Sequence, residues 1–422
     1  MNDHQALRIS GADSSASAPQ QTKEYRSGVF AKARREGGGG WGLVAIDLVE
    51  PPNPVTLGDG AVVGSASREA RVEGPGVAAE HMRVTVRSDG CYFEDLGGAE
   101  GTFVGGVRAR RIGVMHGDVV RLGRQLAIFV ERDLASYAGS IERSGELVHG
   151  PKQRRDWIDP ALDLVRAGSS VCIEGPPGVG KRSLAKLAAA LREAAGEVVT
   201  IDGSAEVKPT TAAPPGARPM TWVVFDADKL PRPIQLEIAH SVGRSSGVVI
   251  IATTSQPLDR ATGDGHVAPW FASLFSGKRV PIPALDARRE DVPAIVRDIA
   301  DRRGIALDRI SPELLEALVR AGWPGGVPQL EATLVAAAEA SPEGPLSVTG
   351  VANSLSRAVR IKPSLPPSAD PALARARLED ALARANGSVA SAARSLGMSR
   401  QAIYREADRL GLDIARRKLP RP

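Results

Sequence analysis

Residues 175–183, GPPGVGKRS, place glycines and a lysine at the spacing of a loop that binds phosphate. They follow an apolar run that ends at Ile173 and precede a stretch in which apolar residues recur at helical spacing. In that setting the glycines let backbone N–H groups turn towards phosphate oxygens, and the lysine reaches the outer phosphates. We expect the nucleotide-binding residues to be Gly175, Gly178, Val179, Gly180, Lys181, Arg182, Ser183 and Asp226.

Arg182 stands where such a loop usually has the Ser or Thr that binds magnesium. Ser183 is no simple replacement, because one step along a helix rotates a side chain by about 100°. Asp226 ends another apolar run and could still hold a metal. ATP with magnesium is therefore the candidate cofactor, and Asp226 is the candidate metal ligand.

The C-terminal end of the chain is basic, whereas the rest is nearly neutral. Of 54 Lys/Arg and 49 Asp/Glu residues, segment 373–422 holds 11 and 5, and the remainder holds 43 and 44. A basic end on a neutral body is typical of proteins that bind nucleic acid phosphates. From charge alone, a solvated basic tail remains the alternative.

Within that segment the apolar spacing predicts two helices joined by a turn at Gly397, with Ser399 as the cap of the second helix. A second helix with polar side chains early in its length is typical of a helix-turn-helix. A small helical hairpin that only packs on its neighbour is the alternative. The expected inward positions include Leu378, Ala381, Leu382, Ile403, Ala407 and Leu410, and the expected DNA-binding residues are Ser399, Arg400, Gln401, Tyr404 and Arg405.

Length and composition restrict the remaining possibilities. The chain has 422 residues, of which 42% are hydrophobic and 24% charged, so we expect two or three globular domains. No apolar run approaches the roughly 18 residues that a membrane-spanning helix needs. Cys91 and Cys172 each lie in an apolar run, which predicts buried, reduced thiols. We expect a soluble, cytoplasmic protein.

Residues 392–405, AARSLGMSRQAIYR, resemble the Fis-type helix-turn-helix that ends many bacterial enhancer-binding regulators. The resemblance covers about 35 residues and implies a recognition helix in the major groove of double-stranded DNA. Because one such unit reads few base pairs, we expect a homo-oligomer on a pseudo-palindromic site.

Residues 146–340 resemble the AAA+ module of sigma-54-dependent activators. The matching stretches follow the phosphate loop in order: IDGSAEV at 201–207, VVFDADKL at 223–230, IIATTS at 250–255, LDARREDVP at 285–293 and GWPGGVPQLE at 322–331. This resemblance implies an α/β nucleotide-binding core followed by a helical lid.

Several catalytic parts of that family are replaced in this chain. Ala227 stands where the family has the Glu that positions water, and Pro328 stands where the lid would supply a sensor Arg. Segment 270–277, WFASLFSG, lacks the Arg of a trans-acting finger, for which only Lys278 or Arg279 remains. A finger alone can contribute about 10³ to 10⁵ in rate, so we expect slow hydrolysis.

The family's GAFTGA loop, which engages sigma-54, is also missing. Its place is taken by a short proline-rich segment at 208–220, KPTTAAPPGARPM. Conventional activation of sigma-54 polymerase is therefore not expected. The AAA+ domain is predicted to bind nucleotide weakly or not at all and to act as an assembly platform, with a wholly inert scaffold as the alternative.

Residues 62–129 resemble an FHA domain, the β-sandwich that reads phosphothreonine. Framework residues match, but four positions that would contact a phosphopeptide are changed: Ser65, Ala78, Glu100 and Gly105. Arg68, Arg71 and Arg83 are the cations that could compensate. We expect a phosphate-independent protein-interaction module, with phosphothreonine binding as the alternative. The candidate surface comprises Ser65, Arg68, His81, Gly101 and Thr102, of which His81 is expected to be structural.

The predicted fold class is multidomain: an all-β FHA-like sandwich, an α/β AAA+ P-loop domain with a helical lid, and an all-α Fis-type helix-turn-helix. The expected ranges are 1–40 for a disordered tail, 41–133 for the FHA-like sandwich, 140–285 for the AAA+ core, 286–360 for its lid, 361–372 for a linker and 373–422 for the DNA-binding domain.

Three functions fit these observations. The first is a DNA-binding transcriptional regulator with an FHA-like docking domain and a poorly hydrolysing AAA+ domain. The second is an active ATP-hydrolysing activator that uses substitute residues. The third is an interaction scaffold that modulates a related regulator by joining its ring.

Overall fold

A computed structural model gives the fold of the chain. It describes residues 41–346 except 88–89, 109, 195, 206–219 and 245–246, and the positions 375, 378, 379, 381, 382, 403, 407, 410 and 412. The predicted tail and linker, the proline-rich segment up to residue 219 and the predicted DNA contacts Ser399, Arg400, Gln401, Tyr404 and Arg405 lie outside the described residues.

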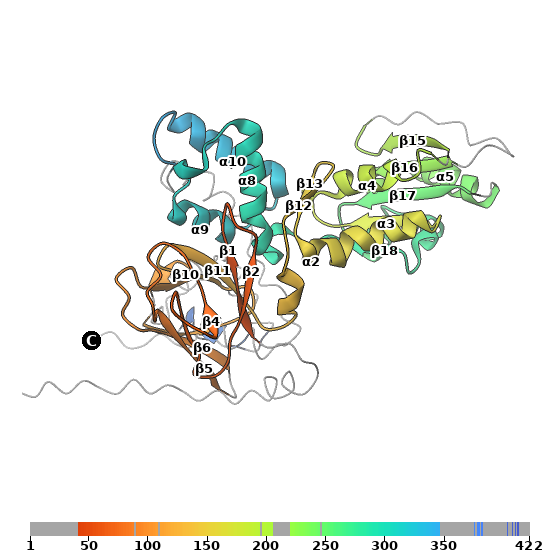
Figure 1. Ribbon diagram of the computed structural model, residues 1–422. Helices are drawn as coiled ribbons and strands as arrows, with labels where there is room; N and C mark the ends of the chain where they lie inside the picture. Colours follow the sequence, from red (N-terminus) through yellow and green to blue (C-terminus); the bar gives the residue numbers. More distant parts are fainter. Residues whose placement is uncertain are drawn as a thin grey trace, which may run out of the picture.

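Two mostly antiparallel sheets form a sandwich in the N-terminal part of the described chain, coloured red to orange in Figure 1. Their inner faces share one apolar core, in which the rings of Phe93 and Phe129 meet edge to face at 5.5 Å between centroids. One sheet has the order β2 (Asn53–Thr56), β1 (Gly42–Ile46), β11 (Gln125–Val130), β10 (Val119–Leu122), β7 (Thr102–Val104) and β8 (Val107–Arg108), and the other β4 (Ala70–Arg71), β3 (Val62–Gly64), β5 (Met82–Arg87), β6 (Gly90–Asp95) and β9 (Arg111–Val114).

Strands β10 and β11 are buried along their whole length. Val120 and Phe129 face the core of the sandwich, whereas Val119 and Ile128 face outwards. The predicted sandwich alone requires each strand to bury one face, and the structure differs because a second layer covers the outer face of this sheet. Continuous apolar strands are typical of a sheet covered on both sides.

A parallel five-stranded sheet forms the nucleotide-binding core. Its central strands are apolar on both faces, which suits a sheet covered by helices on two sides. The strand order is β15 (Glu197–Asp202), β16 (Met220–Phe225), β17 (Val249–Thr254), β14 (Val171–Glu174) and β18 (Arg279–Pro281), and the helices are α3 (Asp159–Arg166), α4 (Lys181–Ala190), α5 (Arg232–Arg244), α6 (Leu258–Gly263) and α7 (Pro269–Ala272).

A short hairpin and three helices complete the described fold. The hairpin, β12 (Glu142–Ser144) with β13 (Leu147–His149), precedes α2 (Pro151–Gln153), whose axis continues through a wider π-helical turn into α3. The three helices form a lid and are α8 (Val292–Arg303), α9 (Pro312–Arg320) and α10 (Gly326–Ala340). Single 3-10 turns lie at 134–137, 227–229, 273–275, 285–287, 289–291 and 307–309.

The lid lies directly against the sandwich, and the parallel sheet lies to one side of both in Figure 1. Buried side chains from β1, β10 and β11 form one apolar cluster with α8, α9 and α10. Leu314 and Leu318 of α9 are completely buried in this cluster. The lid is therefore the layer that covers the outer face of β10 and β11.

The described elements confirm the predicted β-sandwich and the predicted α/β domain with a helical lid. In the predicted C-terminal helical unit, five of the predicted inward residues are buried, namely Leu378, Ala381, Ile403, Ala407 and Leu410. Within the described part of the chain, every helix is too short or too polar to cross a membrane.

Candidate nucleotide site

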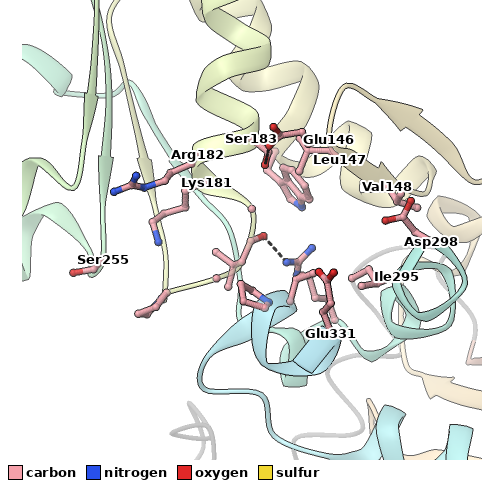
Figure 2. Close-up of a pocket in the computed structure, with 18 of the residues that line it drawn as sticks. Glu146, Leu147, Val148, Lys181, Arg182, Ser183, Ser255, Ile295, Asp298 and Glu331 are labelled. Atoms are coloured by element: carbon pink, nitrogen blue, oxygen red, sulfur yellow. Dashed lines mark hydrogen bonds between the residues drawn. The ribbon is translucent and has the colours of Figure 1, made fainter. Parts of the chain in front are cut away.

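A cavity of about 590 Å³ lies where the parallel core, the β12–β13 hairpin and the lid meet. Figure 2 shows Lys181 and Arg182 on the core side, Leu147 and Val148 on the hairpin, and lid residues opposite them. The cavity follows the carboxyl end of β14. In open parallel sheets, ligands bind beyond the carboxyl ends of the strands, so this is the expected place for a ligand.

The predicted phosphate loop turns directly into helix α4. Gly175, Gly178 and Gly180 all have positive φ angles, which are accessible to glycine at low cost. Lys181 is the first residue of α4, and its Nζ donates a hydrogen bond to the carbonyl of Pro176 at 2.6 Å. Burial lowers the pKa of Lys181, and the nearby Asp226 carboxylate partly opposes this shift.

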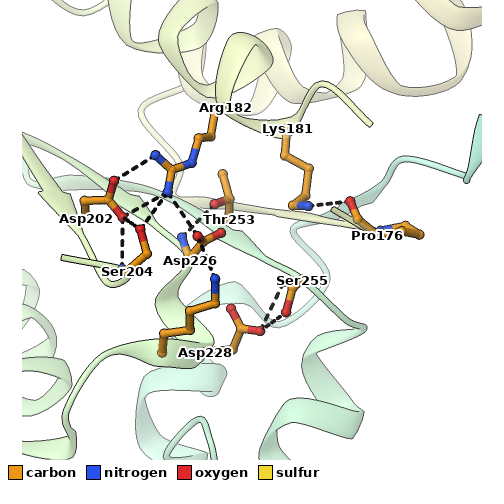
Figure 3. Close-up of polar contacts among 10 residues, drawn as sticks. Pro176, Lys181, Arg182, Asp202, Ser204, Asp226, Asp228, Thr253 and Ser255 are labelled. Atoms are coloured by element: carbon orange, nitrogen blue, oxygen red, sulfur yellow. Dashed lines mark hydrogen bonds and ion pairs between the residues drawn. The ribbon is translucent and has the colours of Figure 1, made fainter. Parts of the chain in front are cut away.

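Arg182 lies at the centre of an ion-pair network at the ends of two neighbouring strands (Figure 3). Its Nη1 and Nη2 donate to the two carboxylate oxygens of Asp202 at 2.7 and 2.9 Å. Nη2 also donates to Oδ2 of Asp226 at 3.0 Å and to the Ser204 hydroxyl at 3.2 Å. Asp202 ends β15 and Asp226 follows β16, so the guanidinium bridges adjacent strand ends.

The same contacts fix the charges of this network. The Arg182 guanidinium lowers the pKa of Asp202 to about 2, and the Asp202 carboxylate raises the pKa of Arg182. A second cation also reaches Asp226, because Lys229 Nζ lies 3.2 Å from its Oδ2. The guanidinium packs on the ring of Phe225 at 4.9 Å from its centroid. Arg182 is thus held as a fixed cation beside the cavity.

The turn after β16 contains Asp226, the candidate metal ligand, and Ala227, which stands where the resembled family has its water-positioning Glu. Asp226 has a left-handed backbone, with φ of 50°, and its amide donates to Thr253 Oγ1 at 2.9 Å. Ala227 is completely buried and has no polar group to offer. The Asp228 carboxylate accepts hydrogen bonds from the amide and hydroxyl of Ser255 at the end of β17. Asp228 is therefore the next carboxylate after Asp226 along the turn, and its position is fixed by hydrogen bonds from Ser255.

The lid contacts the phosphate loop at two of the loop's backbone carbonyls. The amide of Val327 donates to the carbonyl of Gly178 at 2.9 Å, and Arg288 Nη2 donates to the carbonyl of Val179 at 2.7 Å. Arg288 is buried and also pairs with Asp291 at 3.0 Å. Pro328, at the position expected for a sensor arginine, lines the cavity.

The part of the cavity beside the hairpin is more apolar, with Leu147, Trp157 and Ile295 in its lining. Such a surface suits an aromatic base. Ser183 does not face Arg182: its hydroxyl donates to Glu146 at 2.8 Å, and Lys186 pairs with the same carboxylate at 3.0 Å. Ser183 therefore links α4 to the hairpin.

Of the two candidates for a trans-acting finger, Lys278 and Arg279, Arg279 is engaged within the chain. Arg279 Nη1 pairs with Asp259 at 2.6 Å, and its Nε lies 3.9 Å from Glu174. Both partners belong to the same parallel core. Arg279 would have to break these contacts to reach a neighbouring protomer.

In the FHA-like sandwich, the candidate residues occupy the loops beyond β3 and β6 and, for Thr102, the start of β7. His81 is completely buried, and its two ring nitrogens lie 3.0 Å from the amide of Ala78 and 3.1 Å from the carbonyl of Gly101. Thr102 is also buried and donates to Asp95 at 2.9 Å. These two residues hold the loops together.

Ser65 and Arg68 of the same surface are accessible to different degrees. The Ser65 hydroxyl donates to the carbonyl of Val77 at 3.3 Å, whereas Arg68 is exposed. Arg71 is exposed and pairs with Glu73. The structure adds Arg108, an exposed cation whose side chain packs over Gly101 and which the sequence had not singled out.

Sequence reasoning also missed Asp202, Ser204, Lys229 and Arg288. Asp202 could have been predicted from the sequence, because Asp202 and Asp226 each end an apolar run and would meet at one edge of a parallel sheet. An arginine in the magnesium-binding position beside two such acids predicts an ion pair. Arg288 has no comparable signal, since its partner is a backbone carbonyl of a distant loop.

Comparison with known families identifies the two ends of the chain. Residues 55–123 match the FHA domain, and residues 374–405 match the family described as bacterial regulatory protein, Fis family. The chain therefore carries an FHA domain and a Fis-family helix-turn-helix.

Curated relatives match the central part of the chain. The DNA-binding transcriptional regulator NtrC of Salmonella typhimurium is 31% identical over 196 residues, which cover 39% of this chain and 42% of NtrC. The propane 2-monooxygenase operon transcriptional activator MimR of Mycolicibacterium smegmatis is 27% identical over 286 residues, which cover 66% of this chain and 45% of MimR. The chain thus spans less than half the length of these relatives.

Among solved structures, NtrX of Brucella abortus in complex with ATP matches with a TM-score of 0.42 and 22% identity, covering 64% of this chain and 70% of NtrX. With its FHA domain, its Fis-family end and its homology to NtrC, the chain is a relative of the sigma-54-dependent enhancer-binding regulators.

Proposed function

We propose that this relative of the enhancer-binding regulators is a cytoplasmic, DNA-binding transcriptional regulator whose AAA+ domain hydrolyses ATP poorly and serves as an assembly platform. The observation that carries the proposal is the Arg182 network, in which a guanidinium bridges Asp202 and Asp226 beside the phosphate loop. A hydrolysing site needs its acid at this point free to act on magnesium or water.

Two further features support slow hydrolysis. The buried methyl group of Ala227 cannot orient water, and Arg279 is paired within its own protomer. Each change removes a positioning or charge-stabilising group. Because these groups act together in phosphoryl transfer, we expect turnover close to the uncatalysed level.

The C-terminal unit supports DNA binding. Its residues match the Fis family, and Leu378 and Ile403 are buried as a helix-turn-helix requires. We expect a homo-oligomer to place two such units on a pseudo-palindromic site. Arg400→Ala combined with Arg405→Ala should abolish specific, salt-sensitive binding to double-stranded DNA, whereas unchanged affinity would refute this assignment of the recognition helix.

The FHA domain is proposed to dock a protein partner without phosphate. Ser65 and Ala78 offer no cation at the loops beyond β3, and Glu100 adds a negative charge. Phosphothreonine binding through Arg68 or Arg108 is the alternative, which a titration with matched phosphorylated and unphosphorylated peptides would separate.

The decisive experiment is ATP turnover by the purified protein at several concentrations, with and without DNA, beside Lys181→Ala. We expect no turnover above the Lys181→Ala background. Turnover that depends on Lys181 would contradict the proposal and favour an active ATPase.

One observation favours that second function. Asp228 is buried, and its Oδ1 has no hydrogen-bond partner among the described residues. A carboxylate oxygen in that condition could accept a hydrogen bond from water. If turnover is found, Asp228→Asn should remove it; if turnover survives this change, Asp228 is not the substitute acid.

A further inference from the structure

The position of Arg182 conflicts with a magnesium ion at this site. In the common form of the phosphate loop, magnesium takes a hydroxyl from the residue after the lysine and a nearby carboxylate. Here Arg182 occupies the hydroxyl position, and the carboxylate of Asp226 already accepts from Arg182 at 3.0 Å and lies 3.2 Å from Lys229 Nζ. The residues present therefore do not fit magnesium.

Electrostatics lead to the same result. A divalent cation on Asp226 would lie within a few ångströms of a guanidinium and an ammonium, and like charges at such separations repel strongly. The guanidinium cannot lose its proton to relieve the repulsion, because arginine stays charged in proteins. Asp202 and Ser204 also hold it in place through three hydrogen bonds.

Arg182 itself can supply the charge that a metal would bring. A Ser or Thr at this position contributes no charge, whereas arginine adds one positive charge to the acids that end β15 and β16. Its side chain lines the cavity together with Lys181 and is 44% exposed. A planar guanidinium is suited to phosphate oxygens.

Lys181 is available for the same ligand. Its Nζ donates to the backbone carbonyl of Pro176, an interaction that a phosphate oxygen can replace. Lys181 and Arg182 are neighbours on the first turn of α4, where the helix dipole also favours an anion. The phosphate chain would thus meet two cations that belong to the protein.

We propose that Arg182 is a built-in counter-ion, and that this cavity binds the phosphate chain of a nucleotide without a divalent metal ion. The proposal rests on the proposed function only in taking a nucleotide as the ligand of the cavity. In this state the domain holds a nucleotide, but no metal ion is present to support phosphoryl transfer.

The test is a titration of the full-length protein with a fluorescent ATP analogue, mant-ATP, in buffer with excess EDTA and in buffer with magnesium. We expect the two Kd values to differ by less than about tenfold. Lys181→Ala should weaken binding in both buffers, which places the probe at the phosphate loop.

Arg182→Ser provides the second comparison, because it places a hydroxyl after the lysine and removes the guanidinium from Asp226. In this variant we expect EDTA to weaken binding by more than about tenfold relative to magnesium. Arg166→Ser is the matched control, since Arg166 pairs with Asp163 on the exposed side of α3 at 2.8 Å and should leave the titrations unchanged.

The outcomes separate this inference from the proposed function. Wild-type binding that is lost in EDTA overturns the inference and leaves the poorly hydrolysing regulator unaffected. Failure to bind mant-ATP in either buffer also overturns it, and then the platform works without nucleotide. Turnover that depends on Lys181 overturns the proposed function, whichever buffer supports binding.

Discussion

The lid has two interfaces of different kinds, one with the FHA domain and one with the nucleotide-binding core. Towards the FHA domain it buries an apolar cluster shared with β1, β10 and β11, and a buried ion pair joins Arg121 of β10 to Glu316 of α9 at 2.7 Å. Towards the core it donates two hydrogen bonds, one from an amide to the carbonyl of Gly178 and one from Arg288 to the carbonyl of Val179, beside an open cavity.

This difference shows that the lid is packed more like a part of the FHA domain than like a part of the ATPase. Apolar burial stabilises in proportion to area, whereas a few hydrogen bonds at the edge of a cavity contribute little. Two polar contacts extend the FHA side: Arg289 Nη1 donates to the carbonyl of Gly117, and Arg297 Nη1 donates to the carbonyl of Val49. We therefore expect a displacement of the lid to carry the FHA domain with it.

The largest effect should follow from breaking the buried ion pair. Glu316→Ala leaves the Arg121 guanidinium buried without its carboxylate, and removal of one partner of such a pair typically costs about 3–5 kcal/mol. Urea unfolding should show this loss in the unit formed by the FHA domain and the lid. Glu313→Ala, an exposed change on the same helix, is the control, and equal effects of the two variants would contradict the account.

A cavity in the shared cluster should cost nearly as much. Leu314 is completely buried against the sandwich, and Leu→Ala at such positions costs about 2–5 kcal/mol. The same urea titration measures it, with Leu191→Ala, at an exposed leucine of the core, as the control. A small effect at Leu314 would show that this interface is not a true core.

A change at the contact between lid and core should alter the affinity for ligand more than the stability of the protein. Gly326 has φ of 65°, and a methyl group there would lie 2.3 Å from the carbonyl of Gly178. Gly304 has φ of 66° with open space around it. Both changes to Ala should cost about 1–2 kcal/mol of backbone strain, measured by thermal unfolding.

Only Gly326→Ala should also push the lid away from the phosphate loop. Titration with mant-ATP should therefore show weaker binding for Gly326→Ala and unchanged binding for Gly304→Ala. Equal affinities in the two variants would mean that the contact with Gly178 does not shape the cavity.

The smallest effect is expected at the rim of the core, where Lys186 pairs with Glu146 of the hairpin. Both side chains are more than half exposed, and such pairs contribute about 0–1 kcal/mol. Lys186→Ala should change the unfolding free energy within that range, with little further change at high salt. A loss above it would mean that the hairpin stabilises the core more than its contacts indicate.

The sequence predicted the fold class and the phosphate loop because both depend on local patterns. Glycine spacing before an apolar helix determines the loop, and continuous apolar runs identify β14, β16 and β17. The helix-turn-helix was recognisable from the inward spacing of Leu378 and Ile403 for the same reason.

The lid interface was not predicted, although its signal is present. The runs VVRL in β10 and QLAIFV in β11 are buried on both faces, which a two-layer sandwich alone does not require. What covers the second face depends on contacts between segments almost 200 residues apart, as for Arg121 and Glu316. Local spacing carries no information about such pairs.

We expect the lid to unfold as part of the FHA domain, and native-state hydrogen exchange tests this most directly. We predict that amides of α8 and α9 open with the same free energy as amides of β10 and β11. Glu316→Ala should lower the opening free energies of all four elements, while the amides of β14, β16 and β17 keep their protection. Opening of the lid helices together with the core strands, unchanged by Glu316→Ala, would contradict this expectation.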